Sequence, residues 1–127
     1  MAAIDDMEAI ADTLREDGWS VTTPVREESS FDWNTLSLEE VVKTKAAFMN
    51  DYFDIIRTCD VLLIANVEKN GIQGYIGSNT LMEAACGHAL AKPVVFLNPI
   101  GSQPCQLEAM AIATAVLGGT VAGLKKP

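Results

Sequence analysis

The segment from Val61 to Ala65 is an unbroken apolar run, without the alternation that marks a half-buried strand. A second run of this kind, Pro93 to Leu97, follows after a glycine-rich loop and a helix-like stretch. Strands read as continuous apolar runs where helices cover a parallel sheet on both faces. Two such runs joined through a helix therefore restrict the chain to an α/β fold.

The remaining pattern extends this alternation over the whole chain. Apolar residues recur at helical spacing in four segments, and short strand-like runs lie between them. The predicted helices are 4–17, 37–59, 79–91 and 106–113, and the predicted strands are 19–23, 61–65, 93–97 and 114–117. Residues 25–36 read as a polar loop. The order predicts one α/β domain over residues 1–127 with a parallel sheet of about four strands and right-handed crossovers.

The charge of the chain excludes some partners. Seventeen acidic and nine basic residues give a formal net charge of −8, which repels nucleic-acid backbones and anionic membrane surfaces. A single phosphate stays possible, since one helix N-terminus can hold it locally. The first residues lack the basic and apolar regions of a signal peptide, and no apolar run is long enough to cross a membrane. We expect a cytoplasmic protein.

The metal-ligating residues are few. Cys59, Cys86 and Cys105 are widely spaced, and His88 is the only histidine. This pattern predicts free thiols and no metal site. His88 shares the apolar side of its helix with Leu81, which favours a packing role.

Polar and glycine-rich segments follow the buried strands, where ligands bind in parallel sheets. Gly71, Gly74 and Gly77 would allow the backbone to approach a ligand closely. The spacing matches neither a Walker A loop nor a dinucleotide fingerprint. Thr80-x-x-Glu83 reads as a capping box, a structural role that competes with a functional one for Glu83.

The run from Asp60 to Pro99 contains the segment KNGIQGYIGSNTLME. This run resembles the nucleoside 2-deoxyribosyltransferase-like family. The resemblance is greatest to a branch with the pattern K-N-G-I-x-x-Y-I-G-x-N-T-x-x-E. The resemblance implies a flavodoxin-like three-layer fold and N-glycosyl transfer or hydrolysis on a nucleoside or nucleotide. It implies Glu83 as the nucleophile that forms a covalent glycosyl ester, without metal or organic cofactor. The expected substrate-binding residues are Asn66, Asn70, Gly71, Tyr75, Gly77, Asn79 and Asn98.

Two departures from the family pattern accompany the resemblance. Gly77 stands where the transferases carry an aspartate that holds the sugar. Family members begin with a strand and a Gly-Ser-rich turn, whereas this sequence begins at the following helix, so we expect the family's first strand to be missing. The segment 19–23 could pair directly with 61–65, or a partner chain could fill the gap.

Two other functions stay open at this stage. One is a non-catalytic module that binds a nucleotide-like molecule without turning it over. The other is a structural oligomerisation domain with the 37–59 helix as its interface. Because a domain of this size gains from burying a face, we expect a homo-oligomer.

Overall fold

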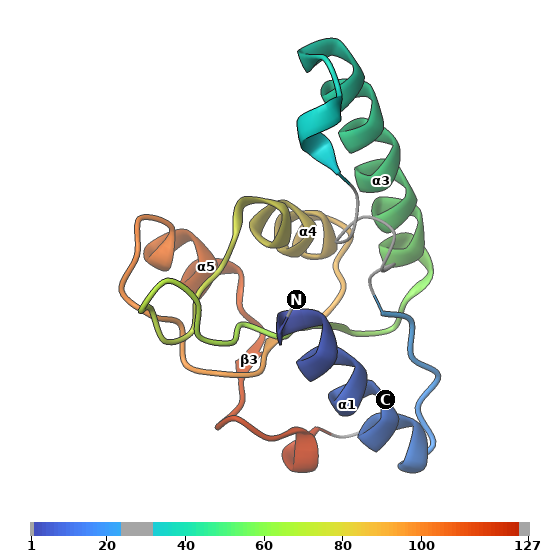
Figure 1. The fold of residues 1–127 in the computed structure, drawn as a ribbon. Helices are drawn as coiled ribbons and strands as arrows, with labels where there is room; N and C mark the ends of the chain where they lie inside the picture. Colours follow the sequence, from blue (N-terminus) through green and yellow to red (C-terminus); the bar gives the residue numbers. More distant parts are fainter. Residues whose placement is uncertain (1, 24–31, 125–127) are drawn as a thin grey trace. The chain divides into compact units, whose positions relative to one another are not determined.

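The computed structural model describes residues 2–23 and 32–124, and the chain divides into two compact units, Met1–Ile55 and Ile56–Pro127. The first unit holds helical elements, and the second holds the sheet with its covering helices (Figure 1). The expectation of a single domain over the whole chain stays a prediction.

The first unit opens with helix α1, Ala2–Glu16, which ends as the sequence predicts. Gly18 adopts a φ of +92°, a conformation that costs glycine little. The Trp19 N–H reaches the Leu14 carbonyl at 3.0 Å, and the Gly18 N–H reaches the Arg15 carbonyl at 3.0 Å. These two bonds form a Schellman motif, which satisfies carbonyls at the end of the helix.

Residues 19–23 are not a strand, contrary to the sequence prediction. The Val21 carbonyl accepts a hydrogen bond from the Arg15 guanidinium at 2.9 Å instead of joining a ladder. The predicted loop at 25–36 lies partly outside the described residues, and its end forms a short 3₁₀ helix, Trp33–Thr35. In the described chain, the fourth strand expected from the sequence is therefore missing.

Helix α3, Leu38–Thr58, is the long helix that the sequence predicts. The Glu40 N–H donates to Ser37 Oγ at 3.2 Å, so Ser37 caps this helix, and the Ser37 hydroxyl donates to Glu40 Oε1 at 3.0 Å. The apolar stripe is only partly covered. Ile56 is buried, whereas Leu38 is 80% and Val42 is 59% exposed.

The sheet of the second unit has three parallel strands in the order β1-β2-β3, as expected for a flavodoxin-like α/β fold. They are β1, Leu62–Ile64, β2, Val94–Phe96, and β3, Ala115–Val116. Ile64 pairs with Phe96, and Phe96 pairs in turn with Val116. The central strand β2 is buried along its whole length, whereas β3 is exposed.

Helices α4, Ser78–Ala89, and α5, Gln106–Ile112, make the crossovers between these strands and contact each other. Ala84 and Ala109 are fully buried in one cluster with Val94 and Phe96. A Cβ on Gly87 would come within 2.9 Å of the Leu62 side chain, so small residues bring α4 close to the sheet. After β3, a short 3₁₀ helix, Val121–Gly123, completes this unit.

His88 is exposed, so the prediction of a packing histidine is wrong. His88 lies in the last turn of α4, one residue before the helix ends at Ala89, whereas the buried residues of the helix are Ala84 and Gly87. In the part of the chain that the structure describes, no helix is both long and apolar enough to cross a membrane.

Phe96 is the side chain on which the core of the second unit depends. We expect Phe96→Ala to lower the free energy of unfolding by about 3–5 kcal/mol, because it leaves a cavity in the central strand. Val116→Ala is the matched control, since Val116 pairs with Phe96 in register yet is 46% exposed, and it should cost less than about 1 kcal/mol. Urea titration followed by circular dichroism measures both; equal losses would contradict this assignment of the core.

Candidate functional site

Two asparagines join the carboxyl ends of β1 and β2. The Asn98 N–H donates to Asn66 Oδ1 at 2.8 Å, and Asn66 Nδ2 donates to the Asn98 carbonyl at 2.8 Å. Asn98 Nδ2 donates to the Asn66 carbonyl at 3.0 Å. The two residues stand two positions beyond the paired Ile64 and Phe96, so their amide groups continue the ladder past the ends of the strands.

The two asparagines satisfy each other's hydrogen-bonding groups. Asn66 is only 1% exposed, and both ends of its side-chain amide are bonded to Asn98. The sequence analysis expected both residues to bind substrate. The structure brings the two residues together as predicted, but the side-chain amide of Asn66 bonds to Asn98 and so holds the two strand ends together.

The turn at Asn70 and Gly71 lies at the exposed tip of the glycine-rich loop. Their φ angles are +54° and +77°, and Lys69 and Ile72 exchange backbone hydrogen bonds across them at 3.0 and 3.2 Å. This is the two-residue hairpin turn that an Asn-Gly pair favours. The Glu68 carboxylate accepts the Gly71 N–H at 2.9 Å.

Gly74 and Gly101 let two loops interlock. A Cβ on Gly74 would overlap the Pro99 carbonyl oxygen, and a Cβ on Gly101 would overlap the Gln73 carbonyl oxygen. The Gly101 N–H also reaches the Gly74 carbonyl at 3.3 Å. Gly74 was expected to admit a ligand, and it instead admits the backbone that follows β2.

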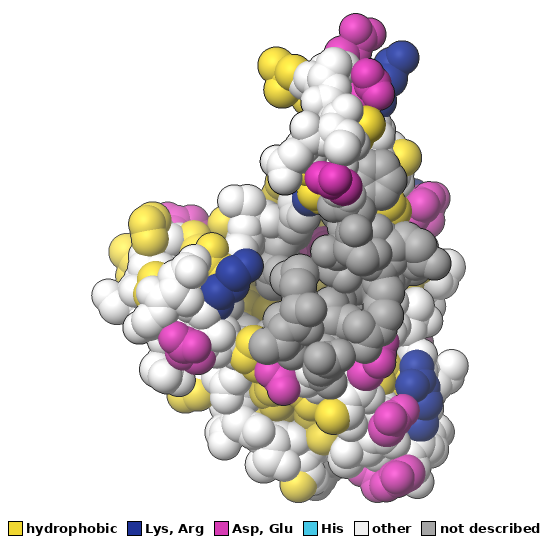
Figure 2. Space-filling view, in the orientation of Figure 1, with side chains coloured by type: hydrophobic (Ala, Val, Ile, Leu, Met, Phe, Trp, Pro, Cys, Tyr) yellow, Lys and Arg dark blue, Asp and Glu magenta, His cyan; other side chains and the backbone are white. Residues whose placement is uncertain are grey.

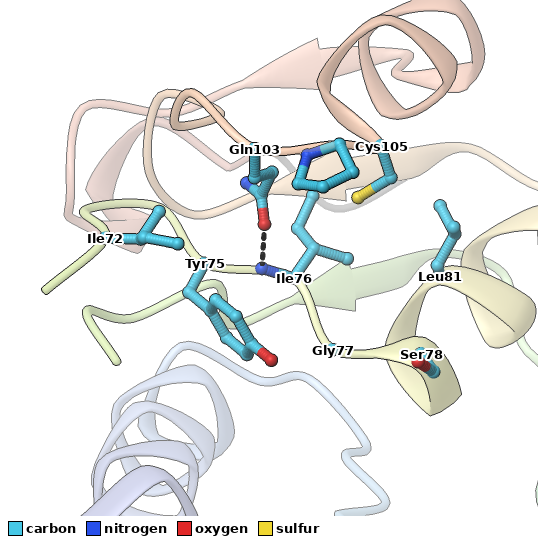
Figure 3. A pocket seen from close by; sticks show the side chains of 9 residues that line it. Ile72, Tyr75, Ile76, Gly77, Ser78, Leu81, Gln103 and Cys105 are labelled. Carbon is cyan, nitrogen blue, oxygen red and sulfur yellow. Dashed lines mark hydrogen bonds between the residues drawn. The ribbon is translucent and has the colours of Figure 1, made fainter. Parts of the chain in front are cut away.

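Gln103 fastens the same two loops with its side-chain amide. Its Oε1 accepts the Ile76 N–H at 2.9 Å (Figure 3), and its Nε2 donates to the Gly74 and Gly101 carbonyls at 2.9 and 3.1 Å. These bonds satisfy backbone groups that no strand or helix pairs. The sequence analysis missed Gln103, because a glutamine after a turn carries no local signal of such a role.

A pocket of about 250 Å³ opens between these loops and the starts of α4 and α5. In Figure 3 the Cys105 sulfur lies between the side chains of Ile76 and Leu81. Tyr75 and Gly77 were expected at a site and are part of this pocket. Its lining consists of Ile72, Tyr75, Ile76, Gly77, Ser78, Leu81, Gln103, Pro104 and Cys105.

Helix α4 begins at this pocket without a side-chain cap. Its N-cap is Gly77, which has no side chain to bond the first-turn N–H groups. The first N–H within the helix to find a carbonyl is that of Leu81, which bonds to Gly77 at 2.9 Å. The first-turn N–H groups and the positive end of the helix dipole favour an anion here.

The predicted capping box at Thr80 and Glu83 is wrong. Because α4 begins at Ser78, Thr80 lies inside the helix and Glu83 lies beyond its first turn, where neither can cap it. The helix dipole does not favour a carboxylate at Glu83 either, since its effect fades within the first turn.

Glu83 is half-buried and lies on a different flank of α4 from the pocket. At about 100° per residue, Glu83 and Asn79 share one flank, whereas Ser78 and Leu81 face the pocket. Leu81 lines the pocket together with Cys105, near the start of α5, and both pack against the same core, so the flank of Glu83 is the one turned away from α5. The expected nucleophile and the pocket are thus carried by one helix but point in different directions.

A positive charge lies beside one of the residues that line the pocket, Tyr75. The Lys69 ammonium lies 5.9 Å from the centre of the Tyr75 ring, in a cation–π arrangement. Lys69 is one of only nine basic residues in a chain with a net charge of −8, and it follows Glu68 directly in the sequence. The sequence analysis did not select Lys69, although it is the first residue of the quoted KNGI motif.

The three cysteines are free thiols, as predicted. Burial raises the pKa of the Cys59 thiol above its ordinary value, so this thiol is less reactive at neutral pH than an exposed one. Cys105 borders the pocket and can report on its occupancy. Among the described residues, no three His, Cys, Asp or Glu side chains are grouped as metal ligands would be.

No protein-family model, no curated protein and no solved structure matches this chain.

The asparagine pair gives a direct test of how the site is framed. We expect Asn66→Ala to lower the free energy of unfolding by about 2–4 kcal/mol, because it leaves buried backbone groups of Asn98 without partners. Asn50→Ala, at an exposed position of α3, should change it by less than about 0.5 kcal/mol. Chemical denaturation of both variants measures the difference, and a tolerant Asn66→Ala would show that the pair does not hold the two strand ends.

Proposed function

We propose that this chain binds a nucleoside 5′-phosphate or a related small molecule with one anionic group. The observation that carries the proposal is the N-terminus of α4, which has no side-chain cap, at a pocket lined by Tyr75, whose ring lies beside the Lys69 ammonium. The first-turn N–H groups and the lysine would share the phosphate, while the tyrosine ring offers a face for a base or sugar.

The size of the pocket narrows the ligand further. About 250 Å³ is below the usual range for sites that enclose a whole drug-sized molecule. A pocket of this size suits one ring system, with the rest of the ligand lying along the loop outside. Its lining is mainly apolar, which favours a flat heterocycle over a bare sugar.

The reaction that we propose at this site is N-glycosyl transfer or hydrolysis with Glu83 as nucleophile. A carboxylate oxygen would form a bond to the anomeric carbon while the bond between that carbon and the base nitrogen breaks. The electron pair of the broken bond would leave with the base, and the base would take up a proton. Water or a second base would then displace the ester and free the carboxylate. Support comes from the motif resemblance and from the half-buried position of Glu83 on α4.

A second candidate is a binding module that does not turn its ligand over. The position of Glu83 favours it, since Glu83 faces a different flank of α4 from the residues that line the pocket. Gly77, in the position where the family carries a sugar-binding aspartate, favours it as well.

Binding is tested first with a matched pair of ligands. Isothermal titration should show that a nucleoside 5′-monophosphate binds more tightly than the same nucleoside. Lys69→Ala should weaken binding of the monophosphate by roughly five- to tenfold, because one charge contact is lost, and should leave binding of the nucleoside unchanged. Lys43→Ala, at an exposed position of α3, is the control for net charge.

Alkylation of Cys105 shows whether the ligand sits in this pocket. Bound monophosphate should slow the reaction of Cys105 with iodoacetamide, followed by peptide mass spectrometry, and should leave that of Cys59 unaltered. If the two lysine variants weaken binding equally, or Cys105 is not protected, the ligand does not occupy the pocket.

Catalysis is tested by base release from a panel of nucleosides and 5′-monophosphates, measured by chromatography. We expect wild-type protein to release a free base, and Glu83→Gln to lower that rate by at least about 10³-fold, as removal of a nucleophile does. Binding that is retained in Glu83→Gln would separate loss of chemistry from loss of the site. Saturable binding without base release by wild type would establish the binding module instead.

A further inference from the structure

We propose that Asn70 is a modification site, at which the chain deamidates its own side chain with the Glu68 carboxylate as the base. Asn70 is the only asparagine of the sequence that a glycine follows. Asn70 and Gly71 are both exposed at the tip of the loop after β1. In the described part of the chain, nothing lies within 4 Å of the place where a Cβ on Gly71 would stand. The space beside the Gly71 nitrogen, which must attack the Asn70 side chain, is therefore open.

The reaction consumes only water. The Gly71 backbone nitrogen forms a bond to Cγ of Asn70, and the bond from Cγ to Nδ2 breaks. The side-chain nitrogen leaves as ammonia, together with the proton that the Gly71 nitrogen gives up. Water then opens the cyclic imide at one of its two carbonyl carbons. Opening at Cγ leaves aspartate, whereas opening at the main-chain carbonyl carbon leaves isoaspartate, in which the main chain runs through the side chain.

The Glu68 carboxylate already holds the proton that must leave. Its Oε1 accepts the Gly71 N–H at 2.9 Å, which is within the reach of a general base. An amide nitrogen is a weak nucleophile while it keeps its proton, and transfer of that proton to the carboxylate as the ring closes lowers the barrier. The departing ammonia takes the proton up again, so the carboxylate is regenerated. The turn thus holds nucleophile, base and reacting side chain within three residues of each other.

Deamidation changes both the charge and the length of the turn. Either product adds a negative charge directly after Lys69, whose ammonium lies 5.9 Å from the centre of the Tyr75 ring. Isoaspartate also lengthens the main chain between Lys69 and Ile72, so the hydrogen bonds of 3.0 and 3.2 Å that these two residues exchange are lost. Basic side chains are few on the face drawn in Figure 2. A consequence that rests on the proposed function is that deamidation weakens binding of the anionic ligand.

The consequence for binding is tested with Asn70→Asp, which carries the new charge without the longer main chain, since aspartate tolerates a positive φ. Isothermal titration with a nucleoside 5′-monophosphate should show roughly two- to fivefold weaker binding than wild type. Unaltered affinity would overturn the link between the modification and the ligand. If wild type binds no monophosphate at all, the proposed function and this consequence fail together, while the modification itself is decided by mass spectrometry.

The modification is tested by peptide mass spectrometry of folded protein that is kept at neutral pH and physiological temperature. Asn70 should lose its amide over time, with aspartate and isoaspartate as products, while Asn34 and Asn50 keep theirs. These two asparagines are exposed as well, but Thr35 and Asp51 follow them instead of glycine. Conversion that is no faster at Asn70 than at Asn34 and Asn50 would overturn the proposal.

The role of Glu68 is tested in the same assay. Glu68→Gln should slow conversion of Asn70 at least about tenfold, because a positioned general base contributes this much or more. Glu39→Gln removes the same charge from an exposed position of α3 and should leave the rate unchanged. In concentrated urea, wild type and Glu68→Gln should react at one rate, since the turn that aligns the carboxylate is gone. Equal rates in the folded proteins, or a faster reaction of Glu68→Gln, would overturn the assignment of Glu68 as the base.

Discussion

The second unit depends on the pairing of Asn66 with Asn98. Three hydrogen bonds of 2.8 to 3.0 Å extend the register of β1 and β2 beyond the last strand residues, at the edge where both chains must diverge into loops. Side-chain amides can do this because they carry the same donor and acceptor as a peptide group. This pairing sets where the glycine-rich loop and the loop after β2 begin. It therefore also sets where the pocket can form.

Much of this architecture could be predicted from the sequence. The apolar runs at 61–65 and 93–97 mark β1 and β2, since full burial leaves no alternation to confuse with helix. Ser37 with Glu40 and Gly18 mark helix ends through bonds that form within a few residues. Such short-range bonds depend only on residues that are neighbours in the sequence. The Asn70-Gly71 turn can be predicted for the same reason.

Other features could not be predicted from the sequence, because they depend on distant parts of the chain. A strand needs a partner, and residues 19–23 had strand-like composition without one. Thr80 and Glu83 had the spacing of a cap, but the helix begins two residues earlier, at Ser78, in the frame set by the loop before it. Gln103 acts through bonds to residues 27 and 29 positions away. The contact of Lys69 with the Tyr75 ring is seen only in the folded chain.

Helix α4 serves several neighbours at once, and this makes its length hard to change. One side packs on the sheet through Ala84 and Gly87, one flank borders the pocket, and another carries Glu83. Inserting a single residue would turn every later side chain by about 100° around the axis. Glu83 would then rotate toward the sheet and Ala84 away from it. The helix can therefore diverge by exchange of side chains, but insertions and deletions must fall in the loops at its ends.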